Sequence, residues 1–177
     1  MRLAQIRSPE LSTARLALRL PTPADIAPMS VLLNDLDVAR MLARVPHPYH
    51  VTDGETFLAH VAASDPTEQR LFVLETPVDG LVGVVGLDLI EGRTELGYWL
   101  GKPFWGRGYM TEAVGAVLKW VGEEWGRRFL VSRHFADNPA SGRVLTKTGF
   151  LYTGEVRQRM SVARGEAVAS RMMVWLA

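Results

Sequence analysis

GKPFWGRGYMTEA, residues 101–113, places two glycines and an arginine between an apolar segment and a long helical pattern. A helix N-terminus presents unpaired N–H groups and about half a positive charge, which stabilise phosphate oxygens that come near it. Gly106 and Gly108 remove the side chains that would block this approach, and Arg107 adds a mobile cation. A tight turn is the alternative explanation for the glycines. The order of strand, glycine turn and amphipathic helix favours the anion site.

Two nucleotide-binding motifs that also begin at a strand-to-helix turn do not fit this segment. It lacks the Gly-Lys-Ser/Thr ending of a nucleoside-triphosphate loop. Thr111 occupies the third glycine position of G-x-G-x-x-G. Both motifs are therefore excluded by their residues.

The residues after the glycines have helical periodicity. Val114, Val117, Leu118 and Val121 recur at i, i+3, i+4 and i+7. This spacing predicts a helix that rests on a sheet and ends near Trp125.

Alternating and clustered apolar residues outline the remaining elements. Strands are expected over residues 15–20, 70–75, 81–90, 94–100, 129–135, 150–160 and 167–176. Helices are expected from residue 25, over 53–63 and from 138 to about 149, with a proline-rich loop over 45–50. PVDG, residues 77–80, is a turn signal between two antiparallel strands. The order indicates an α/β fold with a mostly antiparallel sheet.

The composition limits the function classes. The chain has 177 residues, 47% of them hydrophobic, so a single domain over residues 1–177 is expected. Its 20 basic and 19 acidic residues nearly cancel, which argues against nucleic acid or a membrane surface as partner. Residues 1–20 lack the apolar run of a signal peptide, and no segment has the roughly 20 apolar residues of a membrane span. A cytoplasmic location is therefore expected.

Metal and thiol chemistry are not expected. The chain has no cysteine, which excludes disulfides, thiolate metal sites and cysteine nucleophiles. The four histidines, His47, His50, His60 and His134, show no metal-ligand spacing.

Four segments resemble the GNAT superfamily of acyl-CoA-dependent N-acyltransferases, and within it the RimJ/RimL-type branch named for ribosomal-protein N-acetyltransferases. They are LSTARLALRLPTPAD, PHPYHVTDGETFLAH, TELGYWLGKPFWGRGYMTEA and DNPASGRVLTKTGF, and they span nearly the whole chain. The last two are the most specific, because an E-L-G-Y-W strand followed by W-G-x-G-Y is hard to find elsewhere. The resemblance implies a splayed mixed β-sheet flanked by helices, with acetyl-CoA as the acetyl donor and no metal.

The resemblance also implies where the cofactor lies. The backbone of Leu100 and Gly101 would pair with the pantetheine arm, and the N–H groups from Arg107 to Thr111 would cradle the pyrophosphate. Asn138 would reach the arm from the next helix, although an ordinary N-cap explains this residue equally well. The full implied set is Leu100, Gly101, Trp105, Gly106, Arg107, Gly108, Tyr109, Met110, Thr111 and Asn138. Of these, Trp105 takes a position where many relatives carry Gln or Arg.

Acyl transfer from a thioester to an amine requires a neutral amine, a stabilised oxyanion and a proton for the departing thiolate. An α-amino group, with a pKa of about 8, loses its proton more readily than a lysine side chain at about 10.4. Glu95 is the leading base candidate because it shares a strand face with Gly97 and Trp99, beside the expected cofactor. A structural role for Glu95 is equally favoured. Glu112, in the first turn of the long helix, is the weaker candidate.

The proton donor departs from the common family pattern. Leu145 occupies the place where many superfamily members have a tyrosine. The branch resemblance makes Ser141 the substitute, and the alternative is that Ser141 simply faces solvent. Tyr152 is a weaker acid candidate, and His134 is expected on a strand that faces the splay.

The acceptor is the least determined part. The resemblance places acceptor contacts on the first two helices and the loop 46–49, with His47, Tyr49 and Phe57 as candidates, and Phe57 is equally consistent with the core. The leading hypothesis is N-acetylation of a protein or peptide N-terminal α-amino group. The alternatives are a small amine or antibiotic acceptor, and a non-catalytic acyl-CoA-binding module. Homodimers are common among such folds, but no residue here demonstrates one.

Overall fold

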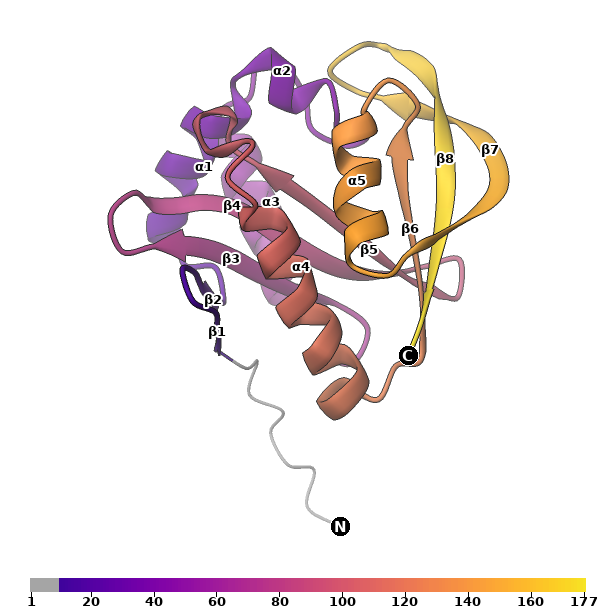
Figure 1. Ribbon diagram of the computed structural model, residues 1–177. Coiled ribbons are helices and arrows are strands. Elements are labelled where there is room, and N and C mark those ends of the chain that lie inside the picture. The colour runs from indigo at the N-terminus through magenta and orange to yellow at the C-terminus, as the bar shows by residue number, and fades with distance from the viewer. Residues whose placement is uncertain (1–9) are drawn as a thin grey trace.

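The chain folds around one sheet of eight strands. The computed structural model describes residues 10–177. The expectation that residues 1–20 form no signal peptide therefore falls partly outside the described residues. The strand order is β1-β2-β3-β4-β5-β6-β8-β7 (Figure 1). Every neighbouring pair is antiparallel except β5 and β6, which run parallel. The predicted mixed, mostly antiparallel sheet is confirmed.

The bounds of most elements lie within a few residues of the sequence expectation. The strands are β1 Leu11–Ser12, β2 Ala17–Arg19, β3 Arg70–Thr76, β4 Gly80–Ile90, β5 Arg93–Leu100, β6 Phe129–Phe135, β7 Leu151–Ser161 and β8 Glu166–Leu176. The helices are α1 Ile26–Leu33, α2 Leu36–Ala39, α3 Val51–Ala63, α4 Tyr109–Trp120 and α5 Pro139–Lys147. Short 3-10 helices occur at Pro23–Asp25 and Lys102–Phe104, and a π-helical turn at Val121–Trp125.

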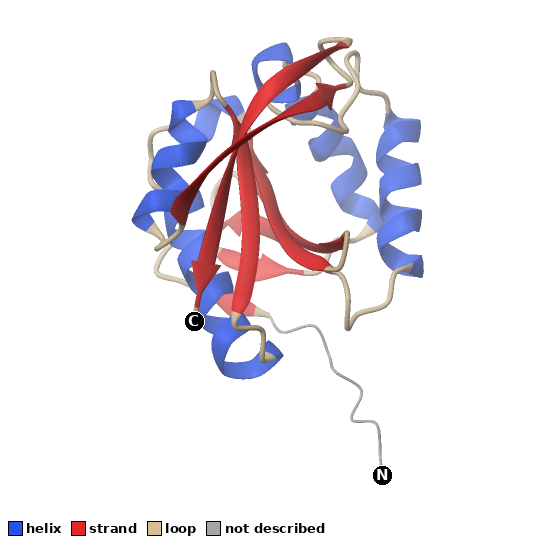
Figure 2. Cartoon of the chain, turned by 90° about the vertical axis from the view of Figure 1, so that its right-hand side faces the viewer, coloured by secondary structure: helices blue, strands red, loops and turns tan. Residues whose placement is uncertain are grey.

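Helices cover both faces of the sheet (Figure 2). Successive side chains of a strand point to opposite faces. Accordingly Val85 packs in the core beneath α4 and α5, whereas its neighbour Val84 packs in a second core with α1 and α3. The four valine and leucine positions that predict α4 are all buried in the first core. The sheet is thus the middle layer of three.

The parallel pair β5–β6 holds together over a short stretch only. Its register pairs are Glu95 with Val131 and Leu96 with Ser132. Beyond this point, toward the C-terminal end of each strand, the two strands have no pairing with each other. The Ser132 hydroxyl donates to the Leu96 carbonyl at 2.8 Å and closes the last paired position. The sheet is therefore splayed between β5 and β6, as the resemblance implies.

Some elements differ from the sequence expectation for local reasons. β2 begins at Ala17 rather than residue 15 because Arg15 leaves the sheet edge to contact Glu112 on α4. The helix expected to reach Trp125 is α-helical to Trp120 and continues as a π-helical turn. The short helix α2 is too brief for its periodicity to show in the sequence. Among the helices of residues 10–177, none has the length and apolarity needed to cross a membrane.

Candidate active site

The splay exposes backbone groups of β5. Gly101 donates its N–H to the Val82 carbonyl on β4 at 2.9 Å. Because the hydrogen-bonding direction alternates along an antiparallel strand, Tyr98 and Leu100 direct their N–H and C=O groups the other way, into the splay. Gly101, whose carbonyl also accepts from the Phe104 N–H at 3.0 Å, does not face the splay. Of the two residues expected to pair with the pantetheine arm, Leu100 directs its backbone groups into the splay and Gly101 directs its N–H to β4.

Trp105 folds back onto the end of β5. Its Nε1–H donates to the Leu100 carbonyl at 2.7 Å, and its side chain is partly exposed. The indole therefore fixes the glycine turn against the strand that enters it. Trp105 thus lies against the C-terminal end of β5.

The geometry of the glycine turn bears on both explanations of its glycines. Gly106 has a φ angle of 75° and Gly108 has a φ angle of 79°. Both lie in the left-handed region, which residues with a Cβ atom rarely adopt. A Cβ at Gly106 would meet no atom within 4 Å, so the surface above it is also open. The turn therefore requires glycine for its backbone and leaves room for a close approach.

The N-terminus of α4 is electropositive and uncapped. Gly108 is the N-cap residue and supplies no capping side chain, so the first-turn N–H groups of Tyr109, Met110 and Thr111 point outward. Arg15 lies over the Tyr109 ring at 4.7 Å and donates from Nη1 to the Arg107 carbonyl at 2.9 Å. Because Arg15 comes from a segment far away in the sequence, no local pattern could assign it to this turn.

Glu112 has a structural environment. It accepts hydrogen bonds from the Thr13 hydroxyl at 2.6 Å and from Arg15 Nε at 2.7 Å. Burial, which raises a carboxyl pKa, is outweighed here by these hydrogen bonds, so the pKa of Glu112 is lowered. Glu112 ties the N-terminal segment to α4, in keeping with its low rank as a base.

The N-terminus of α5 brings a serine to the splay. Asn138 caps the helix by accepting the Ser141 N–H at 3.2 Å, so its N-cap role is present. The Ser141 hydroxyl lies 2.8 Å from the Tyr98 hydroxyl, which also donates to the Ser141 carbonyl at 3.0 Å. Burial raises the pKa of Tyr98, so its phenol stays protonated. The pair joins β5 to α5 beside the opening between β5 and β6.

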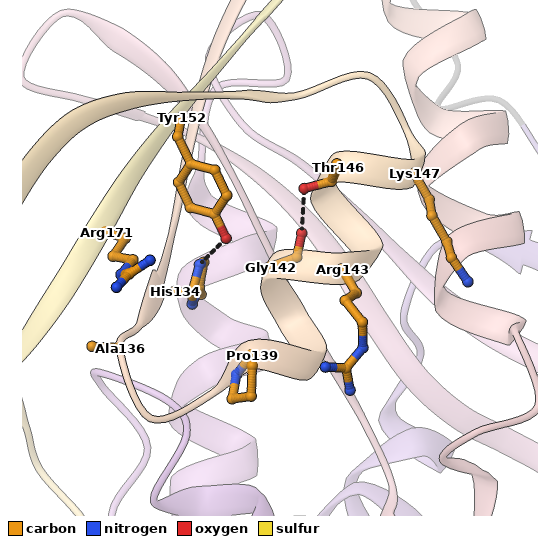
Figure 3. A pocket seen from close by; sticks show the side chains of 9 residues that line it. All are labelled: His134, Ala136, Pro139, Gly142, Arg143, Thr146, Lys147, Tyr152 and Arg171. Carbon is orange, nitrogen blue, oxygen red and sulfur yellow. Dashed lines mark hydrogen bonds between the residues drawn. The ribbon is translucent and has the colours of Figure 1, made fainter.

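A second hydroxyl lies on the other side of α5, in a cavity of about 540 Å³ (Figure 3). His134 Nδ1 is 2.7 Å from the Phe135 carbonyl, which only accepts, so Nδ1 carries a proton. In the neutral ring, Nε2 then accepts from the Tyr152 hydroxyl at 2.9 Å. Gly142 makes room for this pair, since a Cβ there would lie 2.8 Å from His134 Nε2. The Tyr152 proton is thus directed to His134.

Leu145, which stands at the position of the common family tyrosine, is fully buried in the core that includes Phe150. It has no polar group to offer the splay. Tyr98 and Ser141 bring hydroxyls to the splay, whereas the Tyr152 hydroxyl lies beyond α5 with His134.

Glu95 is held between two guanidinium groups. It is 9% exposed, and its two carboxylate oxygens accept separately from Arg133 Nη2 and from Arg159 Nη1, the latter at 3.2 Å. These ion pairs favour the structural alternative for Glu95. Both arginines are far from Glu95 in the sequence, so residue spacing alone could not predict these ion pairs.

The three acceptor candidates, His47, Tyr49 and Phe57, differ in burial. Tyr49 is buried in the core beneath α1 and α3, where burial raises its pKa to about 12. Phe57 is half-buried against the same core, as its alternative predicts. His47, on the loop, is exposed. Within residues 10–177 no three His, Asp or Glu side chains gather in a way that would hold a metal ion.

Known proteins share parts of this chain. A curated relative, the ribosomal-protein-serine acetyltransferase of Escherichia coli, is 31% identical over 83 residues, which cover 45% of this chain and 46% of the relative. The protein YdaF of Bacillus subtilis is 29% identical over 83 residues, 47% of this chain and 45% of the relative. The matched stretch therefore spans about half the length of these curated relatives.

Solved structures share the whole fold. RimL, a ribosomal L7/L12 α-N-protein acetyltransferase in complex with coenzyme A, has a TM-score of 0.76 at 20% identity, covering 93% of this chain and 95% of that one. Spermidine N-acetyltransferase from Vibrio cholerae, in complex with CoA and spermine, has a TM-score of 0.77 at 18% identity, covering 93% and 96%. Residues 15–151 match the family described as Acetyltransferase (GNAT) domain, and these residues include the splayed strands, the glycine turn and both site helices. The chain accordingly belongs to the GNAT acetyltransferase family.

Proposed function

We propose that this protein transfers an acetyl group from acetyl-CoA to a primary amine, and that the amine is the α-amino group of a protein or peptide N-terminus. The observation that carries the proposal is the splay between β5 and β6, which opens beside an uncapped helix N-terminus. Family membership and two similar folds that hold coenzyme A support the donor. The ribosomal-protein acetyltransferases among the relatives support the acceptor.

The residues present fit a coenzyme A group. The N–H groups from Arg107 to Thr111 would bind the pyrophosphate, since they are uncapped and the surface at Gly106 is open. Tyr98 and Leu100 would pair with the pantetheine arm as an added strand does, because their backbone groups face the splay. Trp105 would line the arm near Leu100, and Asn138 would add its side-chain amide from the start of α5.

The bound thioester would supply an activated acetyl carbon, to which the amine nitrogen forms a bond as the carbon–sulfur bond breaks. Ser141 is placed to give its hydroxyl proton to the departing sulfur, because it stands at the splay at the start of α5. The proton that the nitrogen loses as it becomes an amide would restore the Ser141 hydroxyl through water. Because Tyr98 donates its one proton to the Ser141 carbonyl, its phenol oxygen accepts from the Ser141 hydroxyl and holds that hydroxyl at the splay, from which it would turn toward the sulfur. An α-amino group needs little help to become neutral at pH 7, so water can accept its proton. Glu95, tied to two arginines, acts through charge and positioning.

The test is release of free thiol from acetyl-CoA in the presence of N-terminal peptides, polyamines, aminoglycosides and amino acids. The proposal expects turnover with N-terminal peptides and mass addition at the α-amino group. Turnover restricted to polyamines or aminoglycosides would replace the acceptor and keep the chemistry. Tight acetyl-CoA binding without turnover on any amine would instead support the non-catalytic binding module.

A further inference from the structure

The point where β5 and β6 part has two faces. Leu96 packs in the core beneath α4, and the Ser132 hydroxyl bonds the Leu96 carbonyl. Glu95 and Arg133, one residue to either side of this last paired position, point to the opposite face because strand side chains alternate. The α4–α5 face is filled by a core, so an amine reaching the splay must enter from the face of Glu95 and Arg133.

Arginines outnumber carboxylates on this entry face. Glu95 pairs with Arg133 and Arg159. Its cross-strand neighbour Asp88 pairs with Arg44 at 2.9 Å. These three guanidiniums and two carboxylates leave one positive charge uncompensated. Burial foremost, and the nearby Arg133 and Arg44 charges after it, lower the pKa of Arg159 despite the attraction of Glu95.

The arginines also have unused donors. Each guanidinium carries five N–H donors. Among the described residues, Glu95 takes one nitrogen of Arg133 and one of Arg159. Arg133 Nε is buried and has no hydrogen-bond partner within residues 10–177. Buried donors are nearly always bonded in folded proteins, so the bonding capacity of Arg133 is not used up by Glu95.

Space for a ligand adjoins the cluster. Gly97 lies two residues beyond Glu95 on the same strand face and is exposed. A Cβ at Gly97 would meet no atom within 4 Å, so the strand is uncovered there. The strand that carries Arg159 is fixed at its end, where the Val162 N–H donates to the Ala43 carbonyl at 3.0 Å. Arg159 thus lies on a strand whose end is fixed by a backbone hydrogen bond, and the surface of β5 at Gly97 is uncovered.

We infer that Arg159 and Arg133 bind a carboxylate of the acceptor, so that the preferred substrate is a peptide N-terminus with an acidic side chain close to its α-amino group. This inference rests on the proposed function and names its substrate class. A guanidinium edge and a carboxylate match in a bidentate arrangement. A polyamine or an aminoglycoside would instead bring positive charge to a face that already has a surplus.

The experiment compares three peptides that begin with serine and differ only in a second residue of Glu, Gln or Lys. Acetyl transfer is measured as kcat/KM at fixed ionic strength. The wild-type protein is expected to prefer the Glu peptide over the Gln peptide at least tenfold, and to use the Lys peptide least. Equal values for Glu and Gln, or a preference for Lys, would overturn the inference and leave the proposed function standing.

Two variants locate the preference. Arg159→Gln is expected to bring the Glu-to-Gln ratio close to one. Arg157→Gln is the control, because it removes the same charge from β7 at an exposed site paired with Glu155 rather than Glu95. A ratio that falls equally in both variants would assign the preference to general charge and reject the site. If Arg159→Gln does not fold, the wild-type peptide series decides alone. Silence with all three peptides and with the wider amine panel would overturn the proposed function itself.

Discussion

The hydroxyl groups of Tyr98 on β5 and Ser141 on α5 lie 2.8 Å apart, beside the gap that opens between β5 and β6. Tyr98 also reaches the Ser141 carbonyl at 3.0 Å, so a single phenol holds both the backbone and the side chain of the serine. Burial raises the pKa of Tyr98, which makes its phenol a poor source of a proton. In the proposed function Tyr98 is a positioning residue, and Ser141 is the group proposed to deliver the proton.

Replacing these two hydroxyls should have unequal effects on turnover. Ser141→Ala removes the proton donor, and we expect kcat to fall by roughly 10²-fold while acetyl-CoA affinity stays close to wild type. Tyr98→Phe removes only the hydrogen bond that orients Ser141, and we expect kcat to fall roughly tenfold. Steady-state kinetics with varied acetyl-CoA separates kcat from KM.

The matched control for these hydroxyls is Thr148→Ala. Thr148 follows α5, and its hydroxyl bonds only helix carbonyls of Val144 and Leu145. The kcat of the Thr148→Ala variant should remain at the wild-type level. A Ser141→Ala variant with unchanged kcat would remove Ser141 as the acid, and a Tyr98→Phe variant that changed only KM would reject the positioning role.

A carboxylate at the glycine turn should abolish acetyl-CoA binding. Gly108→Asp places a negative charge where the pyrophosphate is proposed to bind, on a residue whose φ is 79°. Calorimetric titration with acetyl-CoA should show no measurable binding. Gly115→Asp is the control, since Gly115 is exposed on the same helix and a Cβ there meets no atom within 4 Å. Unaltered affinity in a folded Gly108→Asp protein would show that the phosphate site lies elsewhere.

The ion pair of Asp25 with Arg19 should make stability depend on acid pH. Asp25 is 3% exposed and accepts from Arg19 at 2.8 and 2.9 Å. Burial raises its pKa, but the hydrogen bonds of Arg19 and Thr22 outweigh this and set the pKa below the ordinary 3.8. A carboxyl with a lowered folded-state pKa contributes stability above its unfolded pKa and loses that contribution as pH falls through the folded-state value.

Asp25→Asn should therefore lower the free energy of unfolding by about 1.5–3 kcal/mol at pH 7, because it removes the charged hydrogen bonds of Asp25 while Arg19 keeps its ion pair with Glu75. Chemical denaturation across pH should show the difference from wild type shrinking below about pH 4. Asp37→Asn, which removes an exposed pair with Lys102, should stay close to wild type throughout. A difference for Asp25→Asn that is the same at pH 3 and pH 7 would contradict the ionised pair.

The sequence predicts what depends on local pattern. The valines of α4 repeat at helical spacing, PVDG sits at a hairpin turn, and Pro139 follows its capping Asn138, and each of these elements forms where expected. The glycine turn is also local, because the φ angles of Gly106 and Gly108 are set by the turn itself. Local signals thus place the turn at which the pyrophosphate is proposed to bind.

The parts that the sequence missed are contacts between distant segments. Arg15 reaches Glu112 across 97 positions, and Glu95 is shared by Arg133 and Arg159 from two other strands. No spacing rule connects such residues, because the sheet order that brings them together is a global property. The direction of the backbone groups of β5 needs only one long-range contact. Once Gly101 is known to donate to Val82, strand alternation directs the backbone N–H and C=O of Tyr98 into the splay.

One substitution made in two helices should change stability in opposite directions. Ala is favoured over Gly inside a helix by about 1 kcal/mol, so Gly115→Ala, on the open surface of α4, should raise the free energy of unfolding by about that amount. Gly142→Ala should instead lower it by about 1–3 kcal/mol, because the new methyl group would lie 2.8 Å from His134 Nε2 and overpack the Tyr152 contact.

Urea unfolding of the two variants beside wild type measures both signs, and the slope against urea shows whether the unfolded state has changed. Tyr152→Phe combined with Gly142→Ala should recover part of the loss, since it removes the phenol oxygen that the methyl group meets. An increase in stability for Gly142→Ala equal to that of Gly115→Ala would mean that α5 and β7 can separate without cost. The close packing of Tyr152 and His134 against α5 would then not be a fixed feature of the fold.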